Sequence, residues 1–221
     1  MVTNTPDIKF AILATDVVIF TVNERGLNVL LTYAKSGPFS GMPTLPGGLI
    51  KPKEKVRDAV SRFISQVLTT KENYREQLFT FGNPGRDPGG RVVSVTYLAL
   101  ISWRKAKKAT KKGAFWKEVE TLPHLGYDHG EVLEMAQERL SGKIAYTNIV
   151  YGLMPEEFTL TELQSTYEKI LKKTLDKRNF RKKIHSLRML KKLPKLRKNE
   201  AARPAQLYKF KSDKLEKVDV L

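Results

Sequence analysis

The chain has 221 residues and no cysteine, which excludes disulfide bonds and thiolate metal sites. Its formal net charge of +17 at pH 7 favours a polyanionic partner, of which nucleic acid is the commonest in a cell. The longest apolar stretch, FAILATDVVIFTV, is interrupted by Asp16 and is too short to cross a bilayer, and MVTNTPDIKF does not resemble a signal peptide. We therefore expect a soluble cytoplasmic protein with no membrane partner.

The positive charge is concentrated toward the C-terminus. Residues 1–150 hold 21 Lys and Arg against 14 Asp and Glu, a net charge of +7, and residues 151–221 hold 19 against 9, a net charge of +10. Within residues 176–198 there are eleven basic residues and one acid, Asp176. Because these charges fall on one patterned helix, we expect a nucleic-acid interface rather than a generally basic surface.

The first half of the chain predicts strands around one helix. Residues 9–22 and 27–35 are rich in branched apolar side chains and flank the turn-like NERG, which indicates a strand pair. Residues 36–48 are rich in Gly and Pro and predict a loop. In residues 54–68 apolar side chains recur three and four positions apart, which predicts a helix with one buried face.

The middle of the chain predicts more strands and a second helix. Residues 75–81 and 91–103 read as strands around the loop GNPGRDPGG, and residues 113–119 as another. At Asp128 we expect a helix cap whose carboxylate accepts a first-turn N–H, with Glu131 at the third helical position. Strands interleaved with helices predict an α+β domain in which helices sandwich a mixed sheet.

A change of character near residues 142–156 marks a joint, and we divide the chain into 1–145 and 146–221. Thr159 and Glu162 form a predicted capping box at the start of one helix. A second helix is expected from Asp176, with Phe180, Ile184 and Leu187 on its apolar face and cations elsewhere. Two short helices followed by a basic strand-like segment, residues 189–210, are typical of a winged helix-turn-helix.

One motif points to diphosphate chemistry. In GGLIKPKEKVRDAVSRFISQVL, residues 47–68, the positions of Gly48, Glu54, Arg62 and Ile64 match the Nudix box. Nudix hydrolases hold Mg²⁺ or Mn²⁺ with acids on the helix of this motif, because these hard cations prefer carboxylate oxygens.

The chain departs from the box at the acids. It has Phe63, Gln66 and Val67 in their places, so we expect no metal, no cofactor and no hydrolysis. Pairing of Arg62 with Glu54 would then brace the loop formed by Gly47 and Gly48. The alternative is an active hydrolase of nucleoside diphosphate derivatives that carries a basic nucleic-acid-binding tail.

A second loop, GNPGRDPGGR at residues 82–91, offers polar groups for a ligand. Arg86 and Arg91 are suited to phosphates or a carboxylate, and Asp87 to a ribose hydroxyl. A plain hairpin connection explains the same spacing. The three histidines (His124, His129 and His185) lack ligand-like spacing, and we interpret them as surface or cap residues.

The order of these segments resembles the Nudix-related transcriptional regulators of the NrtR type over roughly residues 9–210. The segments that carry the resemblance are GGLIKPKE…R, FGNPGRDPGGRVVSVTYLAL, YDHGEVLEMAQERL, FTLTELQSTYEKIL, LDKRNFRKKI and ARPAQLYKF. The resemblance implies a Nudix-like domain followed by a winged helix-turn-helix domain. It also implies a dimeric repressor of double-stranded DNA, on an operator that is an inverted repeat, with ADP-ribose or a sugar as effector.

Two sets of candidate residues follow. The expected ligand residues are Pro46, Gly47, Gly48, Glu54, Arg62, Arg86, Asp87 and Arg91. The expected DNA contacts are Lys177, Arg178, Asn179, Arg181, Lys182 and Lys183 on the second helix, and Arg203, Tyr208 and Lys209 in the wing. A solvated basic face, or RNA binding by the same tail, are the alternatives that the sequence leaves open.

Overall fold

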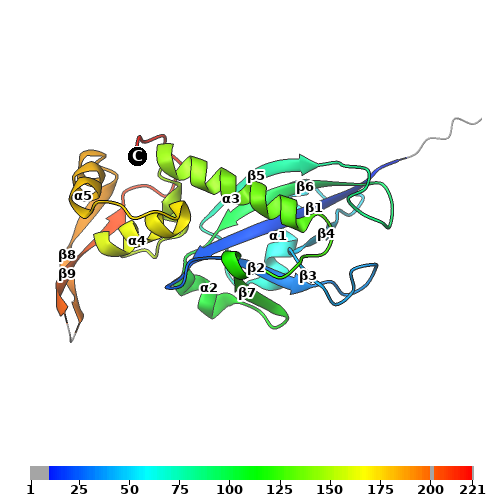
Figure 1. Cartoon of the computed structure of the whole chain (residues 1–221), viewed down its shortest axis with the longest axis horizontal. Coiled ribbons are helices and arrows are strands. Elements are labelled where there is room, and N and C mark those ends of the chain that lie inside the picture. Colours follow the sequence, from blue (N-terminus) through cyan, green and yellow to red (C-terminus); the bar gives the residue numbers. More distant parts are fainter. Residues whose placement is uncertain (1–9, 200–201, 221) are drawn as a thin grey trace, which may run out of the picture.

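The computed structural model describes residues 10–199 and 202–220, and Figure 1 shows the path of the chain. The strands are β1 (Ile12–Val22), β2 (Leu27–Tyr33), β3 (Pro43–Thr44), β4 (Gly47–Leu49), β5 (Tyr74–Phe81), β6 (Val92–Leu100), β7 (Ala114–Glu118), β8 (Leu190–Asn199) and β9 (Ala202–Phe210). The helices are α1 (Val56–Val67), α2 (Trp103–Ala109), α3 (His129–Tyr146), α4 (Leu160–Leu171) and α5 (Lys177–Ser186), with short 3-10 helices η1 (Val119–Thr121) and η2 (Ile149–Gly152).

Seven strands form one mixed sheet. Its order is β3-β2-β1-β6-β5, with β4 paired to β1 and β7 paired to β2. The β1–β6 pair is parallel and the other pairs are antiparallel. Because β1 is covered on both faces, residues 14–21 are all buried, which explains the nearly continuous apolar run of this strand.

Helices cover both faces of the sheet. α1 and α2 pack on one face, in an apolar cluster with residues of β1, β2 and β6. α3 lies across the other face, and its buried side chains share a cluster with α4 and α5 (Figure 1). This arrangement confirms the predicted α+β class and the predicted sandwich.

The C-terminal part adds two helices and a hairpin at one end of the molecule (Figure 1). The predicted capping box is present, because Thr159 Oγ1 accepts from the N–H of Glu162 at 3.2 Å and the Glu162 carboxylate accepts from the N–H of Thr159 at 2.7 Å. The ring centroids of Tyr167 in α4 and Phe180 in α5 are 5.4 Å apart, and this contact packs the two helices together. β8 and β9 pair antiparallel as a wing, as predicted.

Two segments differ in secondary structure from the prediction. The loop at 36–48 includes β3 and β4, because backbone pairing with β2 and β1 overrides the Gly and Pro signal. The strand predicted over 91–103 ends at Leu100, and Trp103 begins α2, since apolar residues at 103, 106 and 109 follow a helical spacing. Lys9, included in the first predicted strand, lies outside the described residues.

Across the described residues, helices are too short or too polar to traverse a bilayer.

Candidate effector cleft and nucleic-acid interface

A cleft of about 570 Å³ opens between β4, the segment after β2 and the first turn of α3. Four of the eight predicted ligand residues line it: Pro46, Gly47, Gly48 and Arg86. The other four, Glu54, Arg62, Asp87 and Arg91, are not among its lining residues. The glycine-rich loop is therefore brought to the cleft, and half of the predicted polar set is not.

Gly47 has a specific steric role in this cleft. It pairs with Asp16 across the β1–β4 ladder. A Cβ added at Gly47 would lie 2.2 Å from Asp16 Oδ1 and 2.7 Å from the carbonyl oxygen of Thr15. Only glycine permits this approach of the loop to β1, and the approach places the loop against the polar floor of the cleft.

Two of the Nudix-box matches, Glu54 and Arg62, form a brace outside the cleft. Arg62 donates to Glu54 Oε1 from Nε at 2.7 Å and to Oε2 from Nη2 at 2.6 Å, and Nη2 also donates to the carbonyl of Leu49 at 3.1 Å. The N–H of Lys51 donates to Glu54 Oε2 at 3.1 Å. The hydrogen bonds from Arg62 lower the pKa of Glu54 to about 2. This confirms the predicted pairing of Arg62 with Glu54.

The positions of the missing acids carry no carboxylate. Phe63 is buried, lies close beneath Gly48, and has the Arg62 guanidinium 4.2 Å from its ring centroid. Gln66 and Val67 line the cleft with an amide and an isopropyl group. Because carboxylate oxygens are what Mg²⁺ needs and Glu54 is already held by Arg62, these residues do not fit a catalytic divalent cation.

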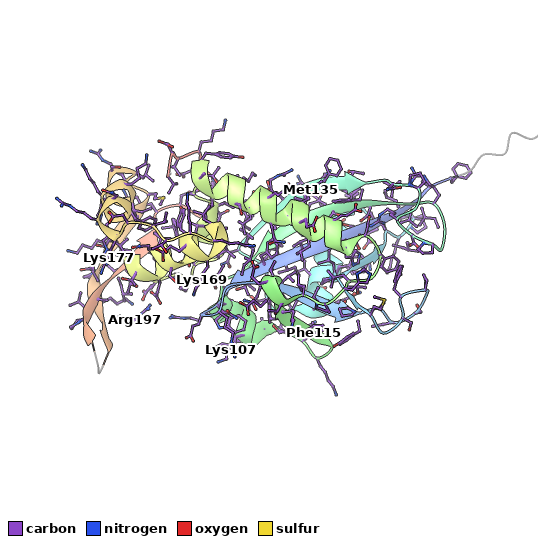
Figure 2. The ribbon with its side chains drawn as sticks, in the orientation of Figure 1. Lys107, Phe115, Met135, Lys169, Lys177 and Arg197 are labelled. Atoms are coloured by element: carbon purple, nitrogen blue, oxygen red, sulfur yellow. The ribbon has the colours of Figure 1, made fainter. Side chains whose placement is uncertain are left out.

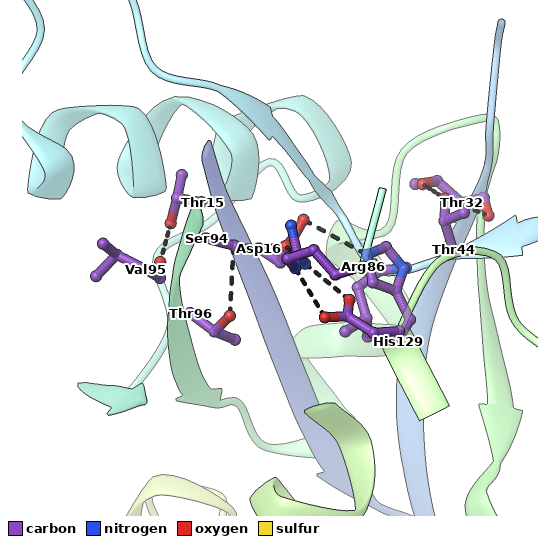
Figure 3. Close-up of polar contacts among 11 residues, drawn as sticks. Thr15, Asp16, Thr32, Thr44, Arg86, Ser94, Val95, Thr96 and His129 are labelled. Carbon is purple, nitrogen blue, oxygen red and sulfur yellow. Dashed lines mark hydrogen bonds and ion pairs between the residues drawn. The ribbon is translucent and has the colours of Figure 1, made fainter. Parts of the chain in front are cut away.

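A buried polar network forms the floor of the cleft (Figure 3). Arg86 donates from Nε and Nη2 to the two oxygens of Asp128, each at 2.7 Å, and Nη2 lies 3.4 Å from Asp16 Oδ2. Ser94 Oγ donates to Asp16 Oδ2 at 2.6 Å. Burial raises the pKa of Asp16, but His129, Ser94 and Arg86 outweigh burial and the pKa is lowered. Asp16 is thus held ionised inside the protein.

His129 completes this network and fixes its orientation. Its Nδ1 accepts from the N–H of Leu45 at 3.0 Å, so the neutral ring carries its proton on Nε2, 3.6 Å from Asp16 Oδ1. The prediction of three surface or cap histidines is wrong here, because His129 is buried, while His124 and His185 are exposed. The sequence signal for this site was Asp16, an acid within an otherwise apolar strand.

Asp128 also departs from its predicted role. It occupies the N-cap position of α3, but its side chain caps no backbone N–H. Both carboxylate oxygens accept from Arg86 instead. The expected cap is therefore wrong, because the ion pair with a buried guanidinium competes for the same oxygens.

The mouth of the cleft is positively charged and aromatic. Lys35 and Lys112 are exposed lining residues. Lys35 follows the end of β2 and Lys112 precedes the start of β7, and these two strands pair with each other. Tyr127 lines the cleft with φ at 59°, a left-handed conformation that is uncommon for a bulky residue. These three residues were not predicted, since nothing local in the sequence marks them.

Asp87 and Arg91 serve the loop that carries Arg86. The carboxylate of Asp87 accepts from the N–H of Gly89 at 2.7 Å, and Arg91 donates to the carbonyl of Gly82 at 2.7 Å. These contacts match the alternative of a hairpin connection, with Arg86 as the residue that the loop delivers to the cleft.

α5 buries one apolar face and exposes most of its cations to solvent. Phe180 and Ile184 are buried against α4, and Asp176 caps the helix by accepting from the N–H of Asn179 at 2.7 Å. The exposed residues of the first two turns are Lys177, Arg178, Asn179 and Lys182. Figure 2 shows Lys177 at the outer end of the molecule.

Two predicted contacts on α5 are partly engaged within the protein. Arg181 is half-buried and donates to Thr161 Oγ1 at 3.3 Å. Lys183 forms an ion pair with Asp219 at 2.9 Å. Both side chains are therefore less free than those of the four exposed residues.

The wing holds its predicted residues differently. Tyr208 is half-buried, packs against the core and pairs through its backbone with Phe158. Lys209 is half-buried in β9 opposite Lys191 of β8. Arg203 lies in β9, and its side chain falls outside the described part of the structure. Arg197 of β8, which is labelled in Figure 2, pairs with Glu162 in the α4 capping box and so ties the wing to that helix.

Comparisons with known proteins agree with this geometry. Residues 150–210 match the family model of the NrtR DNA-binding winged helix domain. The ADPR responsive transcriptional repressor NtrR of Acinetobacter baylyi is 32% identical over 210 residues, which cover 92% of this chain and 84% of that protein.

Solved structures of Shewanella oneidensis NrtR are also similar. Its complex with a 27mer DNA has a TM-score of 0.81 at 33% identity, covering 90% of this chain and 93% of that one. Its Nudix domain complexed with ADP ribose has a TM-score of 0.54 at 34% identity, covering 60% and 90%. The chain therefore belongs to the NrtR family of Nudix-related, DNA-binding transcriptional regulators.

Proposed function

We propose that this protein is a transcriptional repressor whose α5 and wing bind duplex DNA and whose cleft binds ADP-ribose. In this proposal residues 1–145 form the effector-binding part and residues 146–221 the DNA-binding part. The observation that carries the proposal is the set of exposed cations on the first two turns of α5, above a buried apolar base. A helix seated in this way enters a major groove without disturbing the core.

The exposed residues of α5 divide into two kinds of DNA contact. Arg178 and Asn179 have the planar donor groups that recognise guanine O6/N7 and adenine N6/N7 in the major groove. Lys177 and Lys182 are suited to phosphates, which fix the position of the helix without reading sequence. Arg181 and Lys183, which have partners within the protein, are the less favoured members of the predicted set.

A homodimer on an inverted repeat follows from the size of this surface. One α5 with two turns of exposed residues reads only a few base pairs, and a two-fold pair of such helices reads two half-sites. For a repressor that acts on operator DNA we propose a cytoplasmic location.

The charge pattern of the cleft favours ADP-ribose over a neutral sugar. Lys35 and Lys112 at the mouth match the charge of a diphosphate, which a free sugar lacks. The ring of Tyr127 offers a surface for the adenine base, and the ionised Asp16 on the floor is an acceptor for ribose hydroxyls. The volume of about 570 Å³ is within the range of pockets that hold ligands of this size.

We further propose that ADP-ribose is bound and not hydrolysed. Hydrolysis of the diphosphate requires a metal held by carboxylates on α1, and Phe63, Gln66 and Val67 supply none. The Glu54–Arg62 brace preserves the loop without the metal.

Binding experiments on the whole chain test this function. An operator selected from a random duplex pool is titrated by fluorescence anisotropy, with and without ADP-ribose, and a structured RNA serves as competitor. We expect nanomolar binding to an inverted repeat, a change in affinity with ADP-ribose, and weak competition by RNA. Preference for RNA over B-form duplex would overturn the DNA assignment. Release of AMP from ADP-ribose with Mg²⁺, measured by chromatography, would overturn the claim that hydrolysis is absent.

A further inference from the structure

We propose that Asp128 is a positioning residue that couples the cleft to α5, the recognition helix of the proposed DNA-binding part. Its carboxylate would exchange between Arg86 and the N-terminal N–H groups of α3 when a diphosphate ligand engages Arg86. This inference rests on the proposed function, because it assumes that the effector occupies the cleft described above.

The first observation is that Asp128 stands at a cap position without capping. An aspartate at this place normally accepts an N–H from the second or third helical residue, here Gly130 or Glu131. In the structure both oxygens accept from Arg86 at 2.7 Å, and no side-chain cap is formed. The N–H groups of the first turn of α3 therefore receive no side-chain cap from Asp128, and they are the alternative partners that this proposal assigns to its carboxylate.

The second observation is that Asp16 has partners besides Arg86, whereas both oxygens of Asp128 accept from Arg86. Arg86 lines the cleft and is shared by two carboxylates, so the three groups together carry one excess negative charge. Asp16 also accepts from Ser94 Oγ at 2.6 Å and lies 3.6 Å from His129 Nε2. A diphosphate that binds Arg86 bidentately must displace a carboxylate. We expect it to displace Asp128, because the first-turn N–H groups of α3 are then available to that carboxylate.

The third observation concerns the other end of α3. The carbonyls of Tyr146 and Ala145 accept from the N–H groups of Val218 and Val220, at 3.0 and 2.9 Å. Between those two residues, Asp219 pairs with Lys183 of α5 at 2.9 Å. The last turn of α3 is thus bonded to a C-terminal segment that also holds the recognition helix.

The body of α3 connects these two ends. Its buried residues, among them Leu133, Leu140 and Ile144, lie in one apolar cluster with Tyr167 of α4 and Phe180 of α5. Close-packed elements move together rather than deform, so a shift at the first turn of α3 is carried to α5. In a dimer, a small shift in each protomer changes the distance between the two recognition helices and hence the fit to an operator.

The test compares operator affinity with and without saturating ADP-ribose for the wild type and for Asp128→Asn. The substituted side chain can still cap the helix but cannot form the bidentate ion pair. We expect the wild type to change its operator Kd by about 5-fold or more on adding ADP-ribose. The variant should show, without ligand, the Kd of the liganded wild type, and should respond to ADP-ribose by less than about 2-fold.

Two further variants separate coupling from a general loss of structure. Glu131→Gln removes one charge from the same helical turn, where the side chain is exposed, and should keep the wild-type response. Asp219→Asn acts at the far end on an exposed side chain, and should retain ADP-ribose binding while reducing the response. It carries the test if Asp128→Asn does not fold.

The outcomes distinguish this inference from the proposed function. A responsive wild type together with equally responsive Asp128→Asn and Asp219→Asn variants would overturn the coupling role alone. A wild type whose operator affinity does not change with ADP-ribose would overturn the proposed function, and the coupling role with it.

Discussion

Arg62 holds Glu54 through two hydrogen bonds, from Nε at 2.7 Å and from Nη2 at 2.6 Å, and the same Nη2 reaches the carbonyl of Leu49. Two residues that match a catalytic motif are here bound to each other and to the loop before α1. The motif therefore retains its structural part, because a carboxylate and a guanidinium satisfy one another without a metal. The absence of acids at positions 63, 66 and 67 leaves this brace intact.

The brace should make stability depend on acid pH. The pKa of Glu54 is about 2 in the folded protein against an ordinary value of 4.5, so its stabilising contribution is present above pH 4.5 and is lost as the pH falls toward 2. Replacing Glu54→Gln should lower the melting temperature at neutral pH and flatten its dependence across that window. Melting curves by differential scanning fluorimetry measure this, with Asp58→Asn, an exposed acid of α1, as the control. An unchanged slope in Glu54→Gln would contradict the assignment.

Gly47 should not tolerate even a methyl group. In Gly47→Ala the new Cβ would overlap Asp16 Oδ1 and the backbone of Thr15, so we expect a loss of roughly 1–3 kcal/mol in the free energy of unfolding. Gly142→Ala is the matched control, because Gly142 is exposed in α3 with nothing near its Cβ, and should gain up to about 1 kcal/mol. Urea denaturation of both variants gives the two values. A Gly47→Ala variant as stable as the wild type would show that the close approach of β1 and β4 is not required.

The hydroxyl of Tyr167 should destabilise the folded protein. It is buried without a hydrogen-bond partner among the described residues, and burial raises its pKa. Tyr167→Phe removes the unsatisfied group and keeps the ring contact with Phe180, so the protein should be more stable by about 1 kcal/mol. Urea denaturation measures the change, with Tyr208→Phe, in a half-buried wing residue, for comparison. A marked destabilisation would mean that the hydroxyl has a partner.

Arg178 and Lys182 should differ in what they contribute to DNA binding. Arg178→Ala should weaken operator binding by about 1–3 kcal/mol and relax the preference for one base pair, as expected for a base contact. Lys182→Gln should weaken binding to all duplexes similarly and reduce the salt-dependence slope by about 1, as expected for a phosphate contact. Anisotropy titrations at several salt concentrations separate the two, with Lys53→Gln, exposed before α1, as the control. Loss of sequence preference in Lys182→Gln would contradict its assignment to phosphate.

Lys112 should contribute to effector binding without affecting DNA. Removing one exposed cation at the mouth of the cleft should weaken ADP-ribose binding by about 3- to 10-fold in Lys112→Gln. Lys108→Gln, on the exposed side of α2 and away from the cleft lining, should bind like the wild type. Isothermal titration calorimetry measures both, and operator titrations without ligand should give equal affinities. Unchanged ADP-ribose affinity in Lys112→Gln would place the diphosphate elsewhere.

The helices of the C-terminal part were predictable because their signals are local. The capping box at Thr159 and Glu162, and the spacing of Phe180 and Ile184, lie within a few residues of one another and were found as predicted. The error at Asp128 has the opposite cause. Its competing partner, Arg86, is 42 residues away in the sequence, and no local pattern announces it.

By itself the sequence determined the order of the elements, the family, the loss of the metal-binding acids and the cationic face of α5, since each depends on residue type and short-range spacing. Only the tertiary structure decided which polar groups share the cleft. It joined Asp16, Arg86 and His129 from three separate segments, left Asp87 and Arg91 outside, and bonded the end of α3 to the C-terminal segment that holds α5. The physical reason is that burial makes ionised groups seek partners at close range, and the fold of the whole chain sets which partners are within reach.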